Sequence, residues 1–167
     1  MARTAEDILK EAILLEMRGK AFYSNVADKT ESKSAKKIFS QMAQEEDEHI
    51  AFLTKQFQNY VKNKEFLGVD DVEETADDSV ALQVLTEELR KEITAASFEA
   101  AAISSAIDFE DRAVKLYAGR AAEATDPLEV KIYEMLARWE EGHAKALVQL
   151  NEALKEDIWN DNNFWPF

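Results

Sequence analysis

Apolar side chains recur along most of this chain at the three- and four-residue spacing of amphipathic helices. In residues 4–29 these positions are Ile8, Ala12, Leu15, Phe22 and Val26. A second helix is expected over residues 33–62, a third over 97–124 and a fourth from 127 to 155. The pattern therefore predicts four long helices, which together account for most of the chain.

Polar residues mark where these helices begin. Thr4 and Asp7 form a capping box for the first helix, and Ser97 is placed to cap the third. Residues 30–32 make a short turn, and Asp126-Pro127 suits the first turn of the fourth helix. Because short connections make antiparallel neighbours, the first two helices are expected to form a hairpin.

Two segments interrupt the helical period. Residues 64–79 hold Gly68 and an acidic cluster, which predicts a surface connection, and residues 80–92 are amphipathic enough for a short extra helix. The chain ends in an aromatic tail, residues 156–167, with no helical pattern in its sequence EDIWNDNNFWPF. Its large side chains are expected to pack on the bundle or a dimer mate, or to dock on a partner. They are Trp159, Phe164, Trp165 and Phe167.

The two predicted hairpins are related in sequence. Residues 12–55 align with 106–149 without a gap, at an offset of 94 residues, and twelve of the 44 pairs are identical. The matched pairs include Glu16/Glu110, Tyr23/Tyr117, Glu46/Glu140 and His49/His143. Duplicated hairpins joined by a long crossover predict a four-helix bundle with a pseudo-two-fold axis.

Composition agrees with an all-α protein. The 167 residues fit a single domain, 46% are hydrophobic, and only 4 Gly and 2 Pro are present. The absence of Cys excludes disulfides, thiolate metal sites and iron–sulfur centres. The N-terminus has no apolar signal region and no run reaches membrane-spanning length, so a cytoplasmic protein without membrane contact is expected.

The net charge of −14 argues against nucleic acid as a partner, because its phosphates would be repelled. An acidic surface keeps a protein soluble, and it also concentrates cations such as Fe²⁺ near the molecule. Both interpretations stay open at this point.

The chemistry is carried by a Glu-x-x-His pattern that occurs once in each hairpin, and the chain has two histidines in all. On a helix, residues i and i+3 share a face, so a carboxylate and an imidazole can reach one ion. Each pattern has a further Glu thirty residues upstream, among apolar neighbours. The resulting set is Glu16, Glu46, His49, Glu110, Glu140 and His143.

Each part of this set, taken alone, is compatible with a protein that binds no metal. A single Glu-x-x-His is usually an exposed helix pair, and a lone Glu in a core position can form a salt bridge. The duplicated combination is different, because four carboxylates in a low-dielectric core repel one another. Two divalent ions would offset that charge, and four carboxylates with two neutral imidazoles suit iron or manganese.

With this motif the chain resembles the rubrerythrin branch of the ferritin-like superfamily of dinuclear carboxylate proteins, over about residues 4–155. The resemblance implies a ferritin-like bundle that holds two Fe ions. It implies that Glu46 and Glu140 bridge the metals and that Glu16 and Glu110 are terminal ligands. The remaining implied ligands are the two histidines, each capping one ion. It also implies a homodimer, sometimes with exchanged helices.

Two departures from that family bear on function. Rubrerythrins proper carry a rubredoxin domain whose iron is held by four Cys, so for this chain a separate electron donor protein is expected. Typical rubrerythrins also place an extra Glu where this chain has Ala113, whose repeat mate is Gly19. A six-ligand site similar to that of bacterioferritins is therefore expected, with space near the ions. The missing carboxylate favours an oxidase or ferroxidase over a purely peroxidase activity.

Residues next to the ligand set are also candidates for the chemistry. Tyr23 and Tyr117 lie seven residues after Glu16 and Glu110, on the same helix face. They can hydrogen-bond a ligand carboxylate or supply an electron, or they are core tyrosines with satisfied hydroxyls. Glu45 can accept from a histidine N–H across the bundle, whereas its mate Trp139 cannot, so the halves need not be equivalent.

The sequence thus predicts a di-iron oxidoreductase that uses O₂ or H₂O₂, of ferroxidase or peroxidase type. Iron handling and oxidative-stress defence are the expected settings. Three alternatives stay open: an iron-binding or storage protein without turnover, a dimanganese or mixed-metal protein, and a structural bundle without metal.

Overall fold

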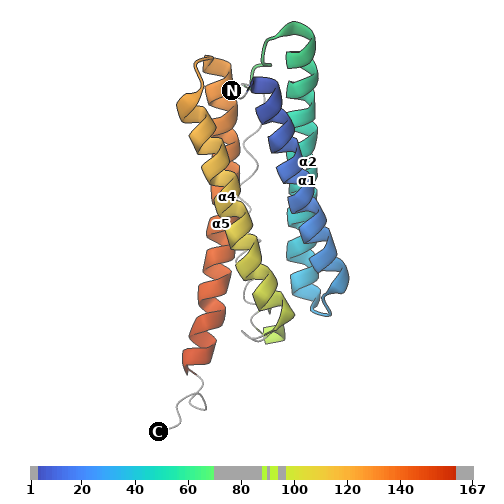
Figure 1. Ribbon diagram of the computed structural model, residues 1–167. Coiled ribbons are helices and arrows are strands. Elements are labelled where there is room, and N and C mark those ends of the chain that lie inside the picture. Colours follow the sequence, from blue (N-terminus) through green and yellow to red (C-terminus); the bar gives the residue numbers. More distant parts are fainter. Residues whose placement is uncertain (1–3, 70–87, 90, 94–96, 161–167) are drawn as a thin grey trace.

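The computed structural model describes residues 4–69, 88–89, 91–93 and 97–160 of the chain. Four long helices dominate it: α1 (Ala5–Lys29), α2 (Lys33–Asn63), α4 (Phe98–Glu123) and α5 (Pro127–Asn160). Helices α1 and α2 form one antiparallel hairpin and α4 and α5 form the other, and the two hairpins lie side by side (Figure 1). The prediction of an all-α four-helix bundle is confirmed.

The helices start where their capping residues predict. The Thr4 side chain accepts a hydrogen bond from the Asp7 backbone, and the Asp7 carboxylate accepts one from Thr4 in return. Ser32 caps α2 and Ser97 caps α4 by accepting from a backbone N–H three residues on. The Asp126 carboxylate accepts from the backbone N–H of Leu128 at 2.8 Å, just before α5 is established.

Helix α5 is longer than its sequence pattern predicts. The expected end near residue 155 is wrong, because the helix continues to Asn160 and takes in the first part of the aromatic tail. No Gly or Pro occurs from residue 143 to residue 165, so nothing in the backbone stops the helix there. The aromatic residues beyond it lie outside the described residues, and their docking stays a prediction.

The start of the predicted surface connection is exposed at Lys64, Glu65 and Gly68, but it also buries one side chain, that of Phe66. Lys64 adopts a left-handed conformation with φ 59°, which ends α2 and turns the chain back along it. Phe66 is consequently buried, with its ring centroid 4.8 Å from that of Tyr60. The Gln56 side chain exchanges two hydrogen bonds with the backbone of Leu67, at 2.9 and 3.2 Å. The remainder of the connection lies outside the described residues.

Part of the expected short helix in the crossover is also described. Glu88, Leu89, Lys91 and Glu92 are helical, and Leu89 is fully buried in the bundle core. The Glu92 carboxylate accepts hydrogen bonds from the hydroxyls of Ser32 and Ser34 at 2.6 and 2.8 Å. These bonds at the N-terminus of α2 lower the pKa of Glu92 to about 2 and anchor the crossover.

The core is divided into two apolar clusters along the bundle axis. One is built from residues 23–27, 35–43, 100–106 and 147–154 of the four helices, together with Leu89 and Ile93. The other contains Ile8, Leu9, Ala12, Leu53, Phe66, Ala113, Tyr117, Ile132, Tyr133, Leu136 and Ala137. In every helix the predicted ligand positions fall between these clusters, so the polar centre is enclosed by apolar layers along the bundle.

The internal repeat is visible in the packing. Tyr23 stacks on Phe39 with ring centroids 6.1 Å apart and planes at 24°, and Tyr117 stacks on Tyr133 with the same values. Phe39 and Tyr133 are repeat mates at the 94-residue offset.

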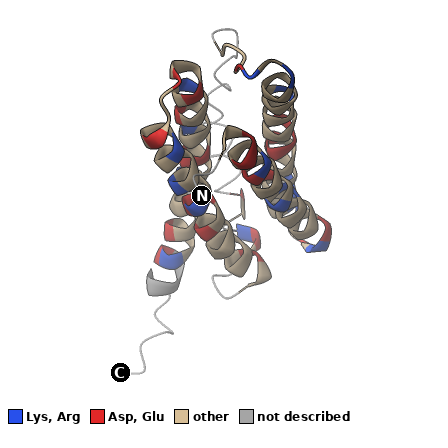
Figure 2. Cartoon of the chain, turned by 45° about the horizontal axis from the view of Figure 1, so that its top comes forward, with Lys and Arg blue, Asp and Glu red and all other residues tan. Residues whose placement is uncertain are grey.

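Basic and acidic positions are interspersed along the four helices (Figure 2). Among the described helices, none combines the length and the apolar character needed to cross a membrane.

Candidate metal centre

Each of the four helices contributes one fully buried glutamate to the middle of the bundle. They are Glu16 from α1, Glu46 from α2, Glu110 from α4 and Glu140 from α5, and none is more than 1% exposed. Burying four carboxyl groups together is unfavourable unless protons or cations compensate their charge. The chain nevertheless places them at one level of the bundle, which indicates a function for the cluster.

The six side chains singled out from the sequence come together as two overlapping groups. In each group the candidate ligand atoms all lie within 4.8 Å of one another. The first group is Glu16, Glu46, His49 and Glu140, and the second is Glu46, Glu110, Glu140 and His143. Glu46 and Glu140 belong to both groups, so they lie between two adjacent positions for an ion.

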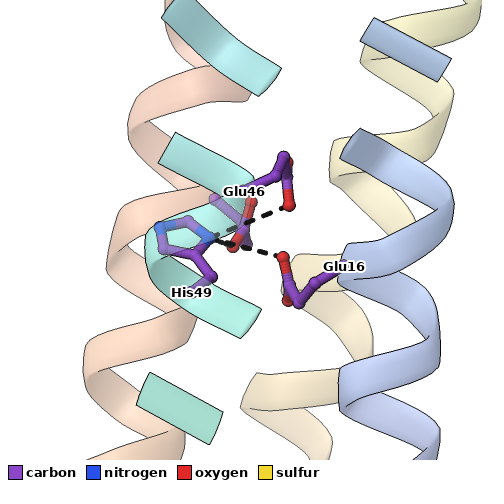
Figure 3. Close-up of side chains that lie close together, drawn as sticks. Glu16, Glu46 and His49 are labelled. Carbon is purple, nitrogen blue, oxygen red and sulfur yellow. Dashed lines mark hydrogen bonds and ion pairs between the residues drawn. The ribbon is translucent and has the colours of Figure 1, made fainter. Parts of the chain in front are cut away.

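His49 turns its Nδ1 atom towards three of the carboxylates. This atom lies 3.0 Å from Glu140, 3.3 Å from Glu16 and 3.9 Å from Glu46. Figure 3 shows Glu46 and His49 projecting from α2 towards Glu16 on α1. The i, i+3 spacing of the Glu-x-x-His motif thus places both donors on the helix face that points into the bundle.

His143 occupies the equivalent position on α5 but has a different outer contact. Its Nδ1 atom lies 3.4 Å from Glu140 and 3.7 Å from Glu110. Its Nε2 atom lies 2.7 Å from a carboxylate oxygen of Glu45, on α2. Glu45 therefore accepts across the bundle, as the sequence predicted.

Several candidate metal-ligand atoms in the cluster lack a hydrogen-bond partner among the described residues. Both oxygens of Glu46, both oxygens of Glu140, Oε2 of Glu110 and Nδ1 of His143 are buried and unsatisfied in this way. Proteins rarely leave buried polar atoms without a partner, and a bound ion can supply one. Carboxylate oxygens with imidazole nitrogens are a donor set that suits Fe²⁺ and Mn²⁺. The residues present fit two such ions.

Burial and neighbouring charges shift the pKa values of three of these glutamates. Desolvation, reinforced by the neighbouring carboxyl groups, raises the pKa of Glu46 far above its ordinary value. Desolvation also raises the pKa of Glu110 to about 7, although His143 opposes the shift. For Glu140 the desolvation is outweighed by the nearby rings of His143 and His49, which hold the pKa of Glu140 well below its ordinary value.

The pKa values of both histidines are also raised, although burial acts on a histidine in the opposite direction. Burial alone would lower the pKa of His49, but Glu140 and Glu16 outweigh it and raise the pKa to about 9. The pKa of His143 is likewise raised, because Glu110, Glu140 and Glu45 outweigh its burial. Without cations the cluster therefore retains protons at neutral pH, and divalent ions would have to displace them.

The two tyrosines support the outer glutamates in a crossed arrangement. Tyr23 on α1 donates a hydrogen bond to Glu110 on α4, and Tyr117 on α4 donates one to Glu16 on α1. Both rings are fully buried. The predicted hydrogen bond to a candidate ligand carboxylate is therefore present in both halves of the repeat.

The space expected next to Gly19 is filled. A Cβ atom at Gly19 would lie 2.8 Å from Cε1 of Phe109 and 3.1 Å from the carboxyl carbon of Glu46. The expectation of open space near the ions is thus wrong on this side, because the Phe109 ring from α4 takes it. Because Gly19 has no side chain, the Phe109 ring can pack close to the Glu46 carboxylate.

Two neighbours of the site were not predicted in their actual roles. Trp139 stacks on the His49 ring, with centroids 4.9 Å apart and planes at 13°. The sequence identified it only as a residue that cannot accept a hydrogen bond. The Gln41 side chain donates to Glu45 at 3.0 Å. The signal for Gln41 was its place one turn before Glu45 on the same helix face.

Comparison with known proteins agrees with this geometry. The rubrerythrin family model matches residues 7–151, a span that contains all six clustered side chains and both tyrosines. No curated protein and no solved structure gives a significant match. Because the family match covers most of the chain and the buried Glu and His cluster lies inside it, this chain belongs to the rubrerythrin family.

Proposed function

We propose that this protein holds two iron ions in the buried cluster and is an oxidoreductase that acts on O₂ or H₂O₂, of ferroxidase or peroxidase type. Its settings are iron handling and defence against oxidative stress. The observation that supports this proposal is the pair of overlapping ligand groups, which share Glu46 and Glu140. In this proposal Glu46 and Glu140 would be shared between the two ions, and each ion would also be held by one of the other two glutamates and one histidine.

The chain's own residues prepare this centre in three ways. Tyr23 and Tyr117 each donate to one oxygen of an outer glutamate, which orients the carboxylate and leaves its other oxygen for an ion. The histidines present Nδ1 to the cluster, so each keeps its remaining proton on Nε2. The two apolar core clusters lie on either side of the ligand residues along the bundle axis, and they keep water away from the site in that direction.

When bound, two ferrous ions supply two electrons together, which O₂ and H₂O₂ chemistry requires. Ala113 occupies the position of the additional family glutamate and is buried. We therefore favour ferroxidase or oxidase activity over purely peroxidase activity. We propose a separate protein as the electron donor, since none of these 167 residues is a Cys that could hold a rubredoxin iron.

A direct test is to titrate the metal-free protein with Fe²⁺ under argon and then mix it with O₂ or H₂O₂. We expect two ions per chain and oxidation to ferric product, followed by its near-ultraviolet absorbance. The Glu46→Ala variant should bind less iron and oxidise it more slowly. Failure to bind two ions would overturn the proposal, and binding without oxidation by either reagent would overturn the enzyme activity.

The strongly acidic composition supports a second candidate function, iron binding or storage without turnover. The net charge of −14 attracts cations to the surface independently of the buried cluster. This function predicts ferric mineral or large assemblies after iron loading, whereas the enzyme predicts steady consumption of H₂O₂ when a reductant is added. Elemental analysis of the protein as purified would show whether manganese replaces iron.

A further inference from the structure

The two halves of the site differ at the repeat mates Glu45 and Trp139. Each lies one residue before a shared glutamate, and each contacts the histidine of the other hairpin. Glu45 places a carboxylate oxygen 2.7 Å from Nε2 of His143. Trp139 lays its ring on that of His49, at 4.9 Å between centroids. The same position in the repeat thus provides a charged acceptor to one histidine and an apolar surface to the other.

This difference extends over a full helical turn. Gln41 donates to the second oxygen of Glu45 at 3.0 Å, which fixes the carboxylate that faces His143. The repeat mate of Gln41 is Met135, a buried side chain that cannot donate a hydrogen bond. All the ion pairs that His49 forms with the described residues run through Nδ1. The supporting hydrogen bonds are therefore present on one side of the site and replaced by packing on the other.

Such an acceptor strengthens a histidine as a metal ligand. A neutral imidazole that binds an ion through Nδ1 carries its proton on Nε2, and a carboxylate that accepts this proton fixes the ring and raises its basicity. The loss of such a partner typically lowers metal affinity by about 10–100-fold. A stacked indole restrains the ring plane, but it leaves the electron density on the ligand nitrogen unchanged.

We infer that the two ion positions are inequivalent, and that the position held by His143 binds a divalent cation more tightly and fills before the position held by His49. This inference rests on the proposed function, because it requires that the cluster binds two ions. In this arrangement Glu45 is a positioning residue, which acts through His143 and does not touch the ion.

The order of filling can be measured with Co²⁺, an air-stable probe whose visible absorbance reports each bound ion. Titration of the metal-free protein should show a tight step and a weaker step. The His143→Ala variant should lose the tight step and the His49→Ala variant the weaker one. Persistence of the tight step in His143→Ala, with its loss in His49→Ala, would overturn the inference.

The role of Glu45 has a matched control on the same helix. Glu45→Gln should weaken the tight step by about 10–100-fold and leave the weaker step unchanged. Gln41→Met should weaken the same step by a smaller factor. Glu48→Gln removes the same charge from an exposed position three residues further along α2 and should change neither step. Unfolding midpoints of the metal-free variants would show whether each is folded; Glu45 is only partly buried, so folding is expected.

The outcomes separate this inference from the proposed function. Two equal binding steps in the wild type, or equal weakening of both steps by Glu45→Gln, would overturn the inference while leaving the two-metal site intact. Failure of the wild-type protein to bind Co²⁺ or Fe²⁺ would overturn the proposed function itself, and the inference with it.

Discussion

Tyr117 on α4 donates a hydrogen bond to Glu16 on α1, a residue 101 positions earlier in the chain. Tyr23 makes the mirror-image bond to Glu110, so each hairpin orients an outer glutamate of the other. The crossed bonds join the two hairpins at the level of the site. Because both glutamates are buried, docking of the hairpins and formation of the site depend on the same contacts.

Removal of the Tyr117 hydroxyl should therefore weaken the whole bundle. In Tyr117→Phe a buried carboxyl oxygen of Glu16 loses its donor, and we expect the free energy of unfolding to fall by about 1–3 kcal/mol. Urea denaturation of the metal-free protein measures this change. Tyr133→Phe is the matched control, since the Tyr133 hydroxyl is buried without a hydrogen-bond partner among the described residues. A loss in the control as large as that in Tyr117→Phe would contradict the assignment.

The clustering of the six side chains could be predicted because its signal is local and repeated. Glu46 and His49 share a helix face by their spacing alone, and the 94-residue repeat supplies the second pair. The two upstream glutamates follow from the same alignment. Helix starts were equally predictable, since a capping residue such as Ser32 acts on a backbone group only three residues away.

Other features depend on how the hairpins dock, which no single helix encodes. The helix face of Tyr23 indicated that it approaches the site, but not that its partner is Glu110 on the other hairpin. Phe109 was recognisable only as an apolar neighbour of Glu110, and its place beside Gly19 follows from packing between α1 and α4. The end of α5 at Asn160 was missed because no breaker residue marks it.

Replacement of Glu46 by Gln should have opposite effects on stability with and without metal. In the metal-free protein the raised pKa of Glu46 means that the folded chain must hold a proton at pH 7 that the unfolded chain releases. Glu46→Gln removes this cost of roughly 3 kcal/mol, about 1.4 kcal/mol for each pH unit above the ordinary pKa. Its thermal midpoint should therefore rise without metal. With Fe²⁺ or Co²⁺ present it should fall below that of the wild type, because a shared ligand is lost. Stabilisation in both conditions would indicate a structural cluster that does not bind metal.

Metal-free protein should lose stability as the pH rises from about 5 to 9. The folded-state pKa values of Glu46, Glu110 and His49 are all raised, the last two to about 7 and about 9. The folded chain thus binds more protons than the unfolded chain in this range. Each excess proton lowers the free energy of unfolding by about 1.4 kcal/mol per pH unit.

Glu140 does not oppose this trend, because a lowered pKa affects stability only below the ordinary carboxyl range. Denaturant midpoints at pH 5, 7 and 9 with a chelator present measure the decline. The slope should be shallower in Glu46→Gln. A divalent ion should reverse it, since binding displaces the protons and becomes stronger at higher pH. A metal-free stability that is constant over this range would contradict the buried arrangement of the cluster.

Gly19 and Gly119 offer a matched pair of helix glycines with opposite expectations. A methyl group at Gly19 would lie 2.8 Å from the Phe109 ring and 3.1 Å from the Glu46 carboxyl carbon, so Gly19→Ala must displace one of them. Overpacking of this kind costs about 1–3 kcal/mol and should also weaken metal binding. Gly119 has nothing within 4 Å of an added Cβ, so Gly119→Ala should stabilise α4 by up to about 1 kcal/mol through helix propensity. The thermal midpoints and the Co²⁺ affinities of the two variants would test these opposite expectations. If Gly19→Ala raised stability as Gly119→Ala does, the Phe109 ring would not occupy the space beside Glu46.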